Sequence, residues 1–210
     1  MTLVITTYDW VPEMARGYVR DLRVRWACEE AGLPYEIETT SVREKTPRHY
    51  ARQPFGQIPM LQDGELSLFE SGAILLYLAE GREALMPQGR AGRAETQQWL
   101  IASLNSLEPV VMALVVARVF DGNEAAAALV LPRLHERLRQ LVPVLEGREF
   151  IACDRFTIAD IMLAEVLRIV DSIGELQPYP VLAAYLERMT ARPAFRRAHA
   201  AQLAHFAEAA

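Results

Sequence analysis

Residues 56–72 read GQIPMLQDGELSLFESG. Two apolar runs, residues 58–61 and 65–69, flank the pair Asp63-Gly64, and an Asp-Gly pair between such runs predicts a β-hairpin. Pro59 stands at the mouth of the first strand; because proline cannot donate to a β-ladder, it occupies an edge or a special bend there, such as a cis peptide. Ser71 follows the hairpin in a position typical of a helix cap. The stretch therefore predicts a hairpin that leads directly into a helix.

Working outward, the residues before this hairpin predict alternating strands and helices. We expect a buried strand over residues 3–6, a helix over residues 22–31 that stops at Gly32, and a second strand over residues 35–38. Within the first helix, Val24, Ala27 and Cys28 share one face, which is expected to be buried. A short helix falls between residues 41 and 53, and the helix that begins at Ser71 ends near Gly81.

After residue 92 the pattern is helical nearly throughout. A Pro/Gly-rich linker covers residues 86–92, and helices are predicted at residues 93–120, 124–146, 157–171, 180–190 and 195–207. Pro109 and Pro132 fall inside two of these helices and should kink or split them. Thr157 and Asp160 form the pattern of a reciprocal capping box. We therefore expect a first domain over residues 1–81, a linker over 82–92 and an all-helical domain over 93–210.

Composition restricts the class of protein. The chain has 210 residues, 51% hydrophobic and 23% charged, with a net charge of −5, which is typical of a globular protein. No basic block could follow a phosphate backbone, and the uninterrupted apolar runs are shorter than the roughly 20 residues of a spanning helix. We expect neither nucleic acid nor membrane as a partner. Two cysteines in no metal-ligand spacing, without an export signal, indicate a cytoplasmic protein that binds no metal.

The hairpin also offers the groups that bind an amino acid. A bend at Pro59 leaves the Ile58 backbone free to pair with an extended peptide. The helix start at Ser71 favours an anion, and the Glu70 carboxylate suits an ammonium group. Together these groups match the α-amino acid end of a ligand. The alternative is a turn proline beside an ordinary serine cap.

These motifs resemble the glutathione transferase superfamily. Residues 56–61 are similar to its strand-opening cis-proline motif, Glu70-Ser71 to its γ-glutamyl-binding pair, residues 156–160 to its helical-domain signature, and the segment from Tyr179 to Phe195 to its closing segment. The resemblance implies an α/β, thioredoxin-like N-terminal domain followed by an all-α C-terminal domain. It also implies glutathione as co-substrate, no metal, a homodimer and a role in detoxification.

The resemblance assigns roles to individual residues. It implies that glutathione is bound by Gln57, Ile58, Pro59, Glu70 and Ser71. The thiolate, the reactive form, is only about 3% populated at pH 7 for a thiol of pKa about 8.5. Lowering that pKa by two units takes about 2.7 kcal/mol, within reach of one hydrogen bond to the anion. Tyr8, at the end of the first strand, and Tyr18, at the start of the first helix, are the alternative donors, with Arg20 as a further candidate.

The second substrate implied is a small apolar electrophile, for which residues 110–116 supply an apolar surface. Two other functions stay open. One is a glutathione-dependent isomerase like the zeta class, although that group's Ser-Ser-Cys motif is missing before Arg23. The other is a transferase-fold protein that only binds partners; such proteins tend to lose the ligand-binding pair that Glu70-Ser71 retains. The absence of a CxxC pair argues against a disulfide oxidoreductase on the same scaffold.

Overall fold

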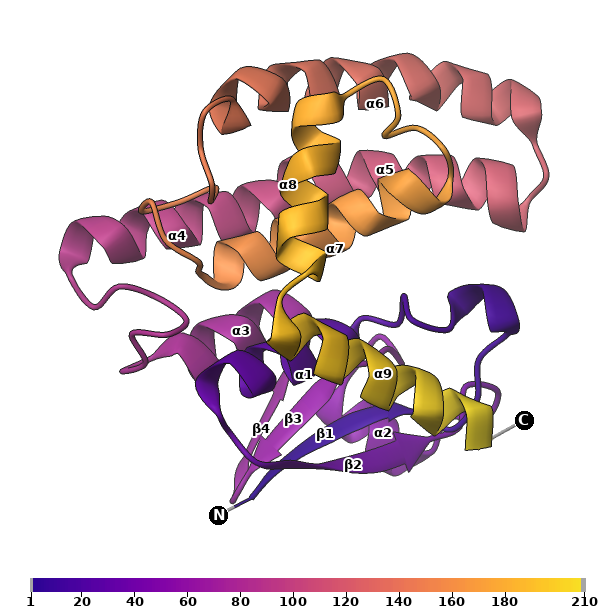
Figure 1. The fold of residues 1–210 in the computed structure, drawn as a ribbon. Helices are drawn as coiled ribbons and strands as arrows, with labels where there is room; N and C mark the ends of the chain where they lie inside the picture. Colours follow the sequence, from indigo (N-terminus) through magenta and orange to yellow (C-terminus); the bar gives the residue numbers. More distant parts are fainter. Residues whose placement is uncertain (1, 209–210) are drawn as a thin grey trace. The chain divides into compact units, whose positions relative to one another are not determined.

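The structure, a computed structural model, describes residues 2–208 (Figure 1). Its contacts divide the chain into two compact units, Met1–Leu85 together with Ala191–Ala210, and Met86–Thr190. The first unit contains the sheet, and the second is helical. The N-terminal α/β and C-terminal all-α architecture expected from the sequence is confirmed.

The first unit is built on a mixed four-stranded sheet. β1 runs parallel to β2 and antiparallel to β3, and β3 is antiparallel to β4, which gives the order β2-β1-β3-β4. The predicted hairpin is present, with Asp63 paired with Leu66 across its turn. The strands are β1 (Leu3–Tyr8), β2 (Tyr35–Thr40), β3 (Met60–Asp63) and β4 (Leu66–Phe69).

The helices of the first unit are α1 (Asp21–Ala31), α2 (Pro47–Arg52), α3 (Ser71–Ala79) and α9 (Pro193–Glu208). As predicted, α1 ends at Gly32. This residue has φ +63°, a conformation that suits a residue without a Cβ. The sequence predicted one buried face for α1, but every residue from Asp21 to Cys28 is buried. The reason is that α1 packs against both α3 and α9.

The second unit contains α4 (Arg90–Ala102), α5 (Glu108–Val115), α6 (Glu124–Leu145), α7 (Ile158–Ser172) and α8 (Pro180–Thr190). The predicted helix over 93–120 is divided by one π-helical segment, Ser103–Leu107, and ends in another, Val116–Phe120. Pro109 is the second residue of α5, after the first of them. Pro132 lies inside α6 without splitting it; its surroundings are exposed, so water can satisfy the carbonyl that loses its N–H partner.

By length and composition alone, the run from Arg90 to Phe120 could cross a membrane. In the structure, one side of this run is packed inside the second unit. Val111 and Leu114 are fully buried, and α5 packs against α6 and α7. The run is therefore apolar because it forms the central helix of a helical bundle.

Asp160 organises the start of α7. The predicted capping box is present: the Thr157 N–H donates to Asp160 Oδ2 (2.8 Å), and the Thr157 hydroxyl accepts from the Ala159 N–H. Asp160 Oδ1 also accepts from the Ile151 N–H and from the Tyr185 hydroxyl, each at 2.9 Å. Its burial raises the pKa of Asp160 to about 6. One carboxylate thus connects three segments of the second unit.

We predict that Asp160→Asn lowers the free energy of unfolding by about 1–3 kcal/mol, because the amide nitrogen would face buried N–H or O–H donors that now have an acceptor. Urea unfolding measures the change. Asp154→Asn is the matched control, since the Asp154 side chain is 90% exposed. Equal stability of the two variants would contradict the role given to Asp160.

The same variant tests the sign of the pH dependence. Native Asp160 holds its proton up to about pH 6, whereas an unfolded aspartate loses its proton near pH 3.9. The native state therefore binds more protons between these values, and the contribution of Asp160 to the free energy of unfolding falls as pH rises from about 4 to 6. Asp160→Asn should lack this part of the pH dependence.

Candidate functional site

The hydrogen-bond register of the sheet places three candidate residues at one end of the first unit. Met60 pairs with Thr6 of β1 and with Phe69 of β4. Tyr8 comes two residues after Thr6, Ser71 two residues after Phe69 and Ile58 two residues before Met60, so all three follow the last pairs of the ladder at the same end of the sheet. Tyr8 packs against the small apolar cluster that contains Ile58. The site is therefore an extension of the sheet beyond its last paired residues.

The loop before β3 presents the backbone of Ile58. The ladder with β1 begins at Met60, and among residues 2–208 the Ile58 N–H and C=O have no hydrogen-bond partner. The Ile58-Pro59 peptide bond is cis, as the motif suggested. Both residues are buried, whereas the Gln57 side chain is exposed. An extended ligand can pair with Ile58 as an added strand.

Gln53 fixes this loop, a role that the sequence analysis missed. Gln53 is 2% exposed, and its Oε1 accepts from the Phe55 N–H (2.7 Å) and from the Gln57 N–H (3.1 Å). These bonds satisfy two amides in a turn that no ladder reaches. A glutamine directly before a proline was the only available signal. Gln53 thereby positions the residue next to Ile58.

Glu70 and Ser71 form the start of α3. Glu70 has φ +69° and ψ 115°, a conformation that costs a non-glycine residue free energy and is found most often at functional sites. Its side chain is exposed, while Ser71 is 5% exposed. The first N–H groups of α3 have no partner within the helix. A carboxylate can bind these N–H groups, with the Glu70 carboxylate near enough in sequence to meet an adjoining ammonium group.

Arg23 determines which way the Ser71 hydroxyl bonds. Its Nη1 donates to Ser71 Oγ at 3.1 Å, and Arg23 is 1% exposed. Because this bond uses a lone pair of the hydroxyl oxygen, the Ser71 O–H hydrogen is directed elsewhere, as a donor. The guanidinium also adds a buried positive charge beside the candidate anion site. The sequence analysis used Arg23 only as a marker of the first helix and missed this contact.

Tyr8 lies at the end of β1, where the sequence placed it. Lys45 Nζ sits 4.4 Å from the centre of its ring and donates to the Ser41 and Val42 carbonyls. Burial raises the pKa of Tyr8, and the charge of Arg20 opposes that effect. The phenol therefore stays protonated at neutral pH and can act as a hydrogen-bond donor.

Tyr18 and Arg20 come immediately before α1. Tyr18 is 37% exposed, and its N–H donates to the Ala15 carbonyl (3.0 Å). Arg20 occupies the N-cap position of α1, and its charge acts on Tyr8. The structure thus brings Arg20, Tyr8 and Ile58 into one neighbourhood. Tyr18 is in the adjoining turn.

Neither cysteine offers a thiolate of its own. Cys28 is fully buried, and burial raises the pKa of its thiol to about 12. Burial also raises the pKa of Cys153. Both thiols are therefore protonated at neutral pH. Residues 2–208 contain no group of three or more histidine, cysteine or acidic side chains that could hold a metal ion.

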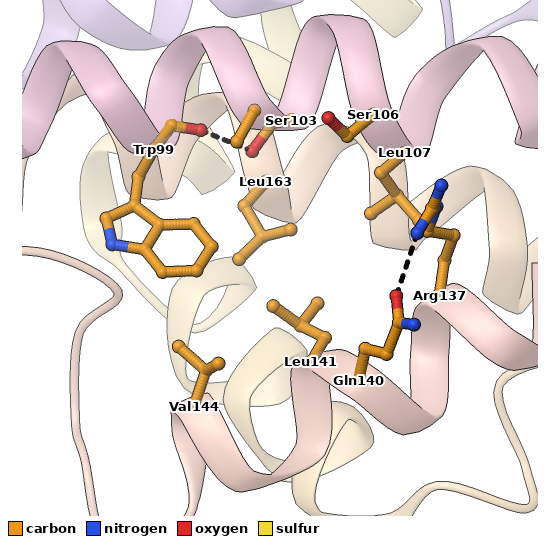
Figure 2. A pocket seen from close by; sticks show the side chains of 10 residues that line it. Trp99, Ser103, Ser106, Leu107, Arg137, Gln140, Leu141, Val144 and Leu163 are labelled. Atoms are coloured by element: carbon orange, nitrogen blue, oxygen red, sulfur yellow. Dashed lines mark hydrogen bonds between the residues drawn. The ribbon is translucent and has the colours of Figure 1, made fainter.

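A separate pocket of about 170 Å³ lies within the second unit (Figure 2). Apolar side chains from α4, α6, α7 and the π-helical segment Ser103–Leu107 surround it, and Arg137 and Gln140 lie on one side, joined by a 2.9 Å hydrogen bond. The apolar part is formed by Trp99, Leu107, Leu141, Val144 and Leu163. The pocket suits an apolar side chain or a small apolar molecule.

Comparison with known proteins identifies both halves of the chain. Residues 4–80 match the family model "Glutathione S-transferase, N-terminal domain", and residues 104–193 match "Glutathione S-transferase, C-terminal domain". Glutathione S-transferase 4 of Zea mays is 31% identical over 92% of this chain and 91% of its own.

Solved structures agree with the family models. A glutathione transferase family member from Pseudomonas fluorescens, crystallised with two glutathione molecules bound, has a TM-score of 0.82 at 28% identity, covering 94% of this chain and 92% of its own. A glutathione transferase from Burkholderia graminis, also with two glutathione molecules per subunit, has a TM-score of 0.81 at 29% identity over 94% and 87%.

Proposed function

Because this chain belongs to the glutathione S-transferase family, we propose that it lowers the pKa of the glutathione thiol and transfers the resulting thiolate to a small apolar electrophile. The chain is a glutathione transferase with glutathione as its co-substrate. The observation that carries the proposal is the register that gathers Tyr8, Ile58 and Ser71 at one end of the sheet.

In the proposed complex the backbone of Ile58, shaped by Gln57 and Pro59, pairs with the extended tripeptide. The Ser71 hydroxyl, directed by Arg23, and the first N–H groups of α3 hold the γ-glutamyl carboxylate. Glu70 receives the ammonium group. Each end of the amino acid then meets a group of complementary charge.

At the sulfur end, Tyr8 is the proposed donor to the thiolate. A protonated phenol at the end of β1, at the same end of the sheet as Ile58, supplies one hydrogen bond to the anion. Such a bond contributes about 1.5–3 kcal/mol, enough to lower a thiol pKa by about one to two units. Arg20 adds positive charge nearby, and Tyr18 is the alternative donor.

The second substrate is proposed to be apolar because of the surface of α5 and the segment after it. Val111 and Leu114 face the interior of the second unit, whereas Pro109, Ala113 and Val116 are exposed. These three residues are three or four positions apart and form one exposed apolar row on the helix. No charged group in the row would select a polar substrate.

We also propose that the enzyme is a homodimer. Phe55 is 70% exposed, and its backbone N–H donates to Gln53, so the first unit presents an apolar ring on a hydrogen-bonded loop. The pocket of the second unit that is lined by Trp99 and Leu141 (Figure 2) can bind such a ring. In a two-fold dimer each copy supplies one Phe55 and one pocket, so the contact forms twice.

The cytoplasm is the proposed location. Both cysteines are free thiols, as expected in a reducing compartment.

We predict that Ser71→Ala weakens glutathione binding about 10- to 100-fold, the effect of losing one hydrogen bond to a charged group, and that Glu70→Ala weakens it about tenfold. Isothermal titration calorimetry measures both. Glu65→Ala, an exposed acid on the same hairpin, removes the same charge and should bind like the wild type. No binding by the wild type at millimolar glutathione would instead favour a protein that only binds partners.

Tyr8→Phe should slow conjugation of glutathione to a model aryl halide by about 10- to 100-fold, because the thiolate loses one hydrogen bond. Tyr18→Phe removes an identical hydroxyl and should change the rate less than threefold. Initial rates at saturating aryl halide give kcat/KM for glutathione. The reverse order would move the role to Tyr18, and two unaffected variants would move it to Arg20.

Phe55→Ala should shift the protein toward monomer in sedimentation velocity, because truncating a buried aromatic anchor at an interface costs 2 kcal/mol or more, roughly 30-fold or more in the dimer constant. Val144→Arg, which places a charge in the pocket, should do the same. Leu129→Ala is the control, since Leu129 is 79% exposed on α6 and does not line the pocket. A Phe55→Ala protein that remains dimeric would contradict this interface.

A further inference from the structure

The last helix, α9, lies along α1 in the first unit (Figure 1). Phe195, His199, Gln202 and Phe206, which make the contacts described below, are three or four positions apart and therefore share one helical face. In its first turn, Phe195 meets Trp26 edge to face at 4.9 Å, and Arg192, just before the helix, makes two bonds, 2.6 and 2.8 Å, to Glu30. These contacts fix α9 at the far end of α1.

Further along, α9 reaches the turn that precedes α1. His199 stacks on Phe195 and packs against the backbone of Gly17, where an added Cβ would lie 2.6 Å from His199 Nε2. Gly17 has φ +81°, so the turn needs glycine both for its conformation and for this close approach. The turn carrying Tyr18 is thus held against α9.

Gln202 fixes the two residues on either side of Arg20. It is fully buried, and its Nε2 donates to the Val19 carbonyl (2.9 Å) and to Asp21 Oδ1 (2.6 Å). Both partners are acceptors, so the amide orientation is determined. Asp21 is also fully buried and bonds Arg25 at 2.6 Å. One side chain of α9 therefore brackets Arg20 from both sides.

His205 and Phe206 contact Tyr8 and the apolar cluster beside it. His205 Nε2 lies 3.0 Å from the Tyr8 carbonyl oxygen; because that oxygen only accepts, Nε2 is the donor. Phe206 is 1% exposed and belongs to the apolar cluster of Val19 and Ile58 against which Tyr8 packs. Neighbouring residues of α9 thus hold Tyr8, Val19 and Ile58 together.

We propose that Gln202 and His205 are positioning residues for the sulfur end of the glutathione site: from α9 they fix the backbone on which Tyr8 and Arg20 are carried. This inference rests on the proposed function. Neither residue needs to touch glutathione. Their effect comes from geometry, because a displacement of about 1 Å in a group that stabilises charge can lower a rate about 100-fold.

The test separates the sulfur end from the rest of the ligand. Glutathione is titrated in complex with each variant while the ultraviolet absorbance of its thiolate is recorded against pH, and S-methylglutathione, which has no thiol, is bound in calorimetry. For His205→Leu we expect the midpoint of thiolate formation to rise by about one pH unit and the conjugation rate at pH 6.5 to fall about tenfold. Affinity for S-methylglutathione should stay within twofold of the wild type.

Two variants serve as controls. His205→Gln keeps a donor at the position of Nε2 and should restore the wild-type midpoint. Arg196→Ala removes an exposed guanidinium from the same helix and should leave midpoint and rate unchanged. Gln202→Met should reproduce the shift of His205→Leu; the His205 pair decides the matter even when Gln202→Met fails to fold.

An unchanged midpoint in His205→Leu overturns the inference while the proposed function stands. The inference is also overturned if His205→Leu and His205→Gln lose S-methylglutathione affinity and melting temperature together, since that result describes a structural role only. A wild-type complex without any thiolate signal, or without glutathione binding, overturns the proposed function itself and the inference with it.

Discussion

Proline has no N–H to donate, and the consequences of this at Pro59 extend through the first unit. The β1–β3 ladder has its last pair at Met60 and Thr6, so the backbone of Ile58 is left open beyond it. Tyr8 at the end of β1 and Ser71, two residues after β4, follow the last pairs of the two neighbouring strands at the same end. The sheet thus ends where a peptide can continue it. Gln53 then has to satisfy loop amides that no strand can reach.

Buried charge in α1 is the second constraint on this site. Asp21, Arg23 and Arg25 are each 2% exposed or less, and removing such groups from water is costly unless they are well paired. Each is hydrogen-bonded to a residue of the candidate site or to another of these buried residues. Arg23 reaches Ser71, whereas Asp21 joins Arg25 to Gln202. An apolar helix would pack with less cost, but it would leave the Ser71 hydroxyl and the turn before α1 without fixed partners.

The sequence predicted those parts of the fold that depend on neighbouring residues. The hairpin at Asp63-Gly64, the end of α1 at Gly32 and the capping box at Asp160 all follow from local turn and cap chemistry, and all are present. The helical period also predicted a helix near residues 195–207. It could not show what that helix packs against, because the partners of Gln202 lie more than 180 positions away. The all-round burial of α1 follows from the same contact.

This difference explains why the two ends of the candidate site were unequally predictable. The proposed γ-glutamyl end lies within one short stretch of sequence, a bend before a hairpin and a cap after it, so a short motif predicts it. The proposed sulfur end lies where β1, the turn before α1 and α9 meet, and the geometry there is set by side chains such as His205 on a backbone carbonyl. The sequence places Tyr8 only slightly ahead of Tyr18 as the donor, because the contacts of α9 with the Tyr8 carbonyl and with the turn that carries Tyr18 involve residues far along the chain.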